Sequence, residues 1–68
     1  MTEKQQIELL LLYNKALRNG KQCRIEFTVF EQVNMCTWDG FDGDIILNHK
    51  YISGYNEVLT ALQKITGE

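Results

Sequence analysis

The spacing of apolar residues changes twice along the chain, and this change limits the folds open to it. Residues 3–19 carry apolar side chains at helical spacing, residues 23–29 alternate between apolar and polar side chains, and residues 54–66 return to helical spacing. Alternation with a period of two residues indicates a strand with one buried face, whereas helical spacing indicates an amphipathic helix. The sequence therefore predicts a helix at each end of the chain and a β region between them.

Local signals set the limits of both helices. Thr2 followed by Gln5 fits a capping box, in which each residue's side chain bonds the backbone N–H of the other, and Asn19-Gly20 is a typical helix end. We expect the first helix from about Glu3 to Asn19. The second helix, at about 54–66, has Ser53 as its expected N-cap and Gly67 as its stop.

The strands are predicted at three places, Cys23–Val29, Val33–Trp38 and Ile45–Leu47. Because they are consecutive in the sequence, they favour an antiparallel meander with the helices packed on it. The predicted fold class is α+β, in the order α-β-β-β-α, with a three-stranded antiparallel sheet packed against two helices. A chain of 68 residues has room for one core only, so residues 1–68 form a single domain. The expected core includes Ile25, Phe27, Leu59 and Leu62.

The first helix has more apolar surface than one small sheet can bury. One stripe consists of Ile7, Leu10, Leu11 and Leu17, and a second includes Leu9, Leu12, Tyr13 and Ala16. We assign the first stripe to the sheet, so that Leu9, Leu12 and Tyr13 face elsewhere. Either the second helix or a second copy of the chain then covers these three residues, and we include them among the candidate partner-binding residues.

An acidic segment with two glycines, Asp39 to Asp44, is predicted to be a turn that separates the second and third strands. Its aspartates fall at relative positions one, four and six, and Lys50 stands where an EF-hand has its glutamate. We therefore expect weak calcium binding at most. The alternative is an acidic and aromatic surface for a basic partner, with candidate binding residues Trp38, Asp39, Phe41, Asp42 and Asp44.

The residues available for catalysis are few. His49 is the single histidine, and Cys23 and Cys36 are the two cysteines, too few ligands for a zinc site. Nothing in the sequence places Cys36 and His49 within bonding distance of each other. We therefore expect no enzyme activity, no metal and no cofactor.

The net charge of the chain and its N-terminal residues indicate which partners and which cellular location to expect. The formal net charge is −2, which lowers the expectation of a phosphate-binding surface. A basic cluster of Lys15, Arg18, Lys21 and Arg24 also complements the dipole at the end of the first helix, so its role in nucleic-acid binding stays open. The residues at the N-terminus do not form a signal peptide, and no apolar run is long enough to span a bilayer. We expect a cytoplasmic protein without membrane contact.

Residues 33–47, VNMCTWDGFDGDIIL, resemble the first motif of Sm-like RNA-binding proteins. In that motif a strand ends near a glycine, followed by Phe-Asp and an apolar strand, and Gly40, Phe41, Asp42 and residues 45–47 occupy those places. This resemblance implies an RNA-binding module. The chain length, the helix end ALRNG at residues 16–20 and the final amphipathic helix are similar to small phage head-to-tail connector proteins, which implies a phage or mobile-element origin.

The sequence thus predicts a small non-enzymatic binding protein, of the regulator or inhibitor type. It would act through protein–protein contacts as a homodimer or against another protein. The alternative is a nucleic-acid-binding module of Sm-like or related type.

Overall fold

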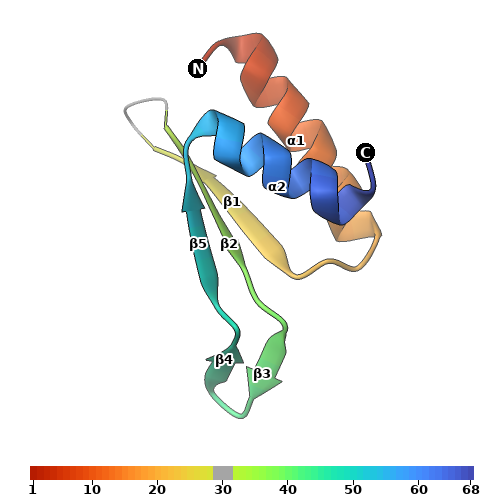
Figure 1. Ribbon diagram of the computed structural model, residues 1–68, viewed down its shortest axis with the longest axis vertical. Coiled ribbons are helices and arrows are strands. Elements are labelled where there is room, and N and C mark those ends of the chain that lie inside the picture. The colour runs from red at the N-terminus through yellow and green to blue at the C-terminus, as the bar shows by residue number, and fades with distance from the viewer. Residues whose placement is uncertain (29–31) are drawn as a thin grey trace.

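The computed structural model describes residues 1–28 and 32–68, and it has the predicted order of a helix, a β region and a helix. They are α1 (Glu3–Arg18), β1 (Cys23–Phe27), β2 (Val33–Thr37), β3 (Gly40–Asp42), β4 (Ile45–Leu47), β5 (Lys50–Ser53) and α2 (Tyr55–Thr66). The strands β1, β2 and β5 form a three-stranded antiparallel sheet in that spatial order, and both helices lie on the same side of it (Figure 1). The α+β fold predicted from the sequence is confirmed.

The third strand of this sheet differs from the prediction. It is β5, whereas Ile45–Leu47 pairs with Gly40–Asp42 in a separate two-stranded hairpin. The two-residue turn begins at Gly43, whose φ of 63° lies in the left-handed region that glycine adopts most readily. The segment predicted to be a loop therefore contains β3 and the turn, and the hairpin extends from the end of the sheet farthest from the helices (Figure 1).

The remaining strand limits are close to those predicted. β1 begins at Cys23 and ends at Phe27, and Val29, which the prediction included, lies outside the described residues. β2 ends one residue before Trp38.

Both helices begin and end near the predicted residues. Gln5 N–H donates to the Thr2 hydroxyl over 3.1 Å and Thr2 N–H donates to the Gln5 side-chain oxygen over 2.8 Å, which confirms the capping box. The predicted N-cap of the second helix is wrong. Gly54 is the N-cap, with a φ of 97° that residues with a Cβ rarely adopt. Gly67 ends the helix as expected.

The core lies between the helices and the covered face of the sheet. Its buried residues come from α1, β1, β2 and α2: Leu9, Leu12, Ala16, Cys23, Val33, Met35, Val58 and Leu62. Of the predicted core residues, Leu62 is fully buried, whereas Ile25, Phe27 and Leu59 are half-buried and pack against this cluster. The prediction is thus confirmed for Leu62, and the other three residues lie at the margin of the core.

The stripe assignment for the first helix is wrong. Leu9 and Leu12 face the core, and Ile7, Leu10, Leu11 and Leu17 are exposed. The buried stripe contains Ala16, whose small side chain lets α1 approach α2 and β1 closely. The apolar spacing alone did not distinguish the two stripes.

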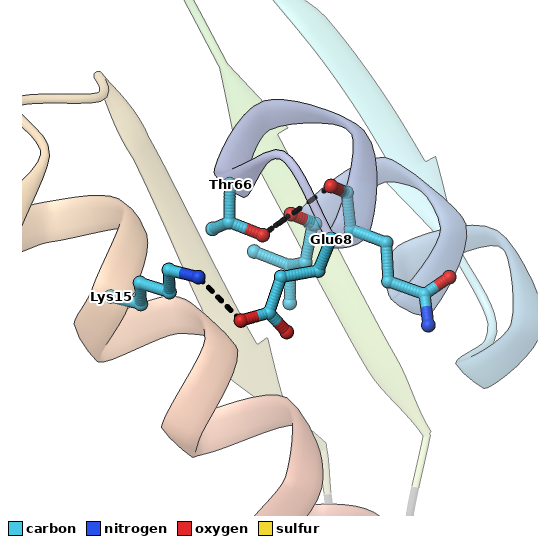
Figure 2. Close-up of polar contacts among 5 residues, drawn as sticks. Lys15, Thr66 and Glu68 are labelled. Atoms are coloured by element: carbon cyan, nitrogen blue, oxygen red, sulfur yellow. Dashed lines mark hydrogen bonds and ion pairs between the residues drawn. The ribbon is translucent and has the colours of Figure 1, made fainter.

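Polar contacts link α1 to α2 along the outside of the core. The Lys15 ammonium pairs with the Glu68 carboxylate just after α2, and within α2 the Thr66 hydroxyl donates to the Leu62 carbonyl over 2.7 Å (Figure 2). The Tyr55 hydroxyl donates to Glu8 Oε1 over 2.5 Å, and this hydrogen bond raises the pKa of Tyr55. In the described part of the chain, neither helix has the length and apolar character needed to cross a membrane.

Candidate binding surfaces

The sheet has one face that the helices leave uncovered. Because side chains alternate along a strand, burial of Cys23 and Met35 beneath the helices places Arg24 and Cys36 on the opposite face. Arg24, Cys36 and Tyr51 lie side by side across the three strands. Together with the hairpin, this face forms a concave surface that encloses a volume of about 380 Å³. The sheet and hairpin therefore provide one candidate binding surface.

The hairpin supplies the apolar part of this surface. Four of its residues are exposed apolar side chains, with exposed fractions between 41% and 64%: Phe41, Ile45, Ile46 and Leu47. The rings of Trp38 and Phe41 lie 6.4 Å apart and are tilted by 58°. Exposed apolar side chains gathered on one small element are typical of an interaction surface.

The predicted partner-binding residues at 38–44 all lie on or next to this hairpin. Trp38 and Phe41 line the concave surface, and Asp42 belongs to β3. Asp44 is in the turn, and Asp39 accepts a hydrogen bond from the Asn48 side chain over 2.6 Å. The structure thus brings the five residues into one region.

A second apolar surface is the outer face of α1. Ile7, Leu10, Leu11 and Leu17 are 50%, 42%, 64% and 46% exposed, respectively. Leu9, Leu12 and Tyr13 were predicted to be covered either by the second helix or by a second copy of the chain, and they pack in or against the core to which α2 contributes. Leu9 and Leu12 are buried, and Tyr13 is half-buried with its hydroxyl 3.5 Å from the Cys23 carbonyl oxygen, to which it donates.

The uncovered face also contains a thiol–imidazole pair. Cys36 Sγ lies 2.7 Å from His49 Nε2, and the His49 ring lies 4.4 Å from the ring of Tyr51. Nothing in the sequence predicted that the two residues would lie together. The pairing arises because β5 lies beside β2, which brings the residue just before β5 close to Cys36. Cys23, by contrast, is buried, and burial raises the pKa of its thiol.

The basic cluster predicted at the end of α1 is divided between two faces. Lys15 pairs with Glu68, and Arg24 lies on the uncovered sheet face with its guanidinium 3.9 Å from the Glu26 carboxylate. The cluster is therefore not one continuous basic surface, and part of its charge is compensated.

Two features of the sequence could have revealed the position of Cys36 on the uncovered face and the strand Lys50–Ser53. The alternation of Val33, Asn34 and Met35 already places Cys36 on the face opposite the buried pair, and the short run Lys50–Ser53 contains the strand-forming residues Tyr51 and Ile52. The run begins two residues after Asn48, a residue type that tolerates the left-handed turn conformation and that has a φ of 52° here.

Residues 1–28 and 32–68 contain no group of three or more His, Cys, Asp or Glu side chains arranged to hold a metal ion. No family model, curated protein or solved structure matches the chain. The interpretation of its surfaces therefore rests on their geometry and chemistry.

Proposed function

We propose that this chain is a non-enzymatic binding protein that works through protein–protein contacts and associates with a second copy of itself through α1. The observation that carries the proposal is the row of four exposed apolar residues on the outer face of a helix whose inner face already fills the core. A contiguous apolar surface of this kind is usually covered by another chain.

The outer face of α1 is suited to an antiparallel pairing with its own copy. A two-fold axis at the level of Leu12 brings Ile7 of one chain to the level of Leu17 of the other, because both lie five residues from the axis. A two-fold interface uses the same surface on both subunits, so each contact occurs twice. Leu10 and Leu11 lie near the axis and would pack at the centre.

Charges at the two ends of α1 favour the same arrangement. The acidic Glu3 stands in the first turn, and Arg18 and Lys21 stand at the other end. In the antiparallel pairing, Glu3 of one copy lies near these basic residues of the second copy. A parallel pairing would instead place like charges together. Lys4 lines the groove between α1 and α2 together with Ile7 and Leu11 of the pairing surface, and the carboxylates of Glu8 and Glu68 line the same groove.

The hairpin and the uncovered sheet face would remain available to a different protein. Asp39, Asp42 and Asp44 surround exposed aromatic and aliphatic side chains, so the surface would suit a partner segment that carries both apolar and basic residues. The activity then follows from occupancy of this surface and requires no catalytic group.

Sedimentation equilibrium tests the self-association. We expect twice the mass of one chain for the wild type and the mass of one chain for Leu11→Glu, because a charge at the centre of the interface opposes association. Thr60→Glu adds the same charge to an exposed position on α2 and is the matched control, which should remain dimeric. A wild type that stays monomeric at millimolar concentration would overturn the proposal.

A further inference from the structure

The contact between Cys36 and His49 carries an inference that is independent of the binding function. Cys36 is half-buried on β2. Its sulfur lies 2.7 Å from His49 Nε2, which is shorter than a van der Waals contact between sulfur and nitrogen. At this distance the thiol can donate a hydrogen bond to Nε2 when His49 carries its hydrogen on Nδ1. The tilted ring of Tyr51 packs beside His49 and limits the positions that the imidazole can adopt.

We propose that Cys36 is a reactive thiol, with His49 as its proton acceptor, and that it takes an anionic low-molecular-weight thiol in a mixed disulfide. The thiolate, rather than the thiol, is the nucleophile in such exchange, and an adjacent base is the usual means of producing it. The site is a modification site, since one thiol compound is attached per chain.

The reaction is a thiol–disulfide exchange whose co-reactant is a low-molecular-weight disulfide. The Cys36 proton moves to His49 Nε2, in the tautomer that carries its hydrogen on Nδ1, and the thiolate attacks one sulfur of the disulfide. The new sulfur–sulfur bond forms as that of the co-reactant breaks, and the departing sulfur leaves with the electron pair and is then protonated. Cys36 is oxidised and the co-reactant is reduced.

The second cysteine of the chain does not compete for this product. Cys23 lies on the covered face of the sheet and is 4% exposed, whereas Cys36 lies on the opposite face. Their side chains point away from each other, so an intramolecular disulfide would require the sheet to open. A mixed disulfide at Cys36 therefore has no resolving cysteine within its own chain.

The surroundings of Cys36 favour an anionic co-reactant. Arg24 is directly opposite Cys36 in the register of β1 and β2, and both line the concave surface of about 380 Å³. Glu26 also lines this surface, on the side of Arg24 away from His49 along the strand, and its carboxylate lies 3.9 Å from the Arg24 guanidinium. The guanidinium can therefore bind a carboxylate of a compound whose sulfur reaches Cys36.

Oxidised glutathione and the neutral hydroxyethyl disulfide are suitable probes, with intact-protein and peptide mass spectrometry as the measurement. In the folded wild type we expect Cys36 to be modified at least tenfold faster than Cys23. His49→Gln keeps a nitrogen that can hydrogen-bond to the sulfur but removes the base, so it should slow modification of Cys36 by about tenfold or more while the unfolding midpoint stays unchanged. Arg24→Gln should slow the reaction with oxidised glutathione and leave that with the neutral reagent unchanged.

Equal rates for the two cysteines of the wild type would overturn the proposal, and this comparison needs no variant. A His49→Gln protein that reacts as fast as the wild type would show that the contact is purely structural. If Arg24→Gln affects both reagents equally, the preference for an anionic co-reactant is wrong.

Discussion

Leu11 and Leu12 are neighbours in the sequence but differ sharply in burial on α1: Leu11 is 64% exposed, whereas Leu12 is 8% exposed and belongs to the core. One helix thus presents leucine both to the inside of its own chain and to the outside. Substitutions at these two positions separate folding from association.

Leu12→Glu should unfold the protein, because a carboxylate in the core has no partner and costs about 3 kcal/mol or more. The whole free energy of unfolding is only roughly 3 to 10 kcal/mol for a domain of this length. Leu11→Glu should keep the helical circular dichroism of the folded chain. Urea titrations of both variants provide the measurement, and the prediction fails if Leu11→Glu loses as much structure as Leu12→Glu.

Reversal of the terminal charges of α1 tests the antiparallel orientation. Glu3→Lys should weaken dimerisation several-fold, since each of its two symmetric contacts with the basic end of the copy is worth up to about 1 kcal/mol. The double variant Glu3→Lys with Lys21→Glu should recover most of the wild-type affinity. Added salt should weaken the wild-type dimer slightly. Dissociation constants of the dimers are measured by analytical ultracentrifugation. If the double variant dimerises as weakly as Glu3→Lys, the antiparallel orientation is wrong.

The buried thiol of Cys23 should make the protein less stable at alkaline pH. Burial raises its pKa, so as the pH rises above the ordinary thiol value of about 8.5, the unfolded chain loses the proton first. The free energy of unfolding therefore falls with rising pH until the folded-state pKa is reached, and the stabilisation is fully present below the unfolded value.

Comparison with Cys23→Ala isolates this contribution. Tyr55, whose pKa is also raised, is present in both proteins, and its effect cancels in the difference. Urea unfolding between about pH 7 and pH 10 should show a steeper decline for the wild type than for the variant. Parallel pH profiles would contradict the prediction.

The turn of the hairpin depends on Gly43. An alanine at its φ of 63° costs about 1–2 kcal/mol, so Gly43→Ala should raise the open population of the hairpin by about tenfold. The amide of Asp39, which donates to the Leu47 carbonyl over 2.9 Å, should then exchange its hydrogen faster. Asp44→Ala, in the same turn but without positive φ, is the control. Equal exchange rates of the Asp39 amide in the two variants would show that the conformation of Gly43 does not control the opening of the hairpin.

Sequence patterns were sufficient for the elements that depend on local rules. The capping box at Thr2, the alternation from Cys23 and the left-handed end at Gly67 each have a short-range physical cause, and the structure contains all three. The failures concern choices that are settled by contacts between distant residues. Which leucine stripe of α1 is buried depends on where α2 lies, and both stripes have helical spacing.

The identity of the third strand was missed for a similar reason. Ile45–Leu47 is the more apolar segment, but Gly43 turns it back onto Gly40–Asp42, and the more polar Lys50–Ser53 pairs with β2 instead. The Cys36–His49 contact follows directly from that pairing, so it could not be predicted while the strand was misassigned. The clustering of Trp38, Phe41 and the aspartates needed only proximity in the sequence and was predicted.

An isotope-filtered nuclear Overhauser measurement on a mixture of labelled and unlabelled chains tests the central claim most directly. Ile7 and Leu17 of one chain are ten residues apart on α1, roughly 15 Å along its axis, so a methyl contact between them must join two copies. We predict an intermolecular cross-peak between the methyl groups of Ile7 and Leu17. The absence of intermolecular cross-peaks from any residue on the outer face of α1 would contradict self-association through this helix.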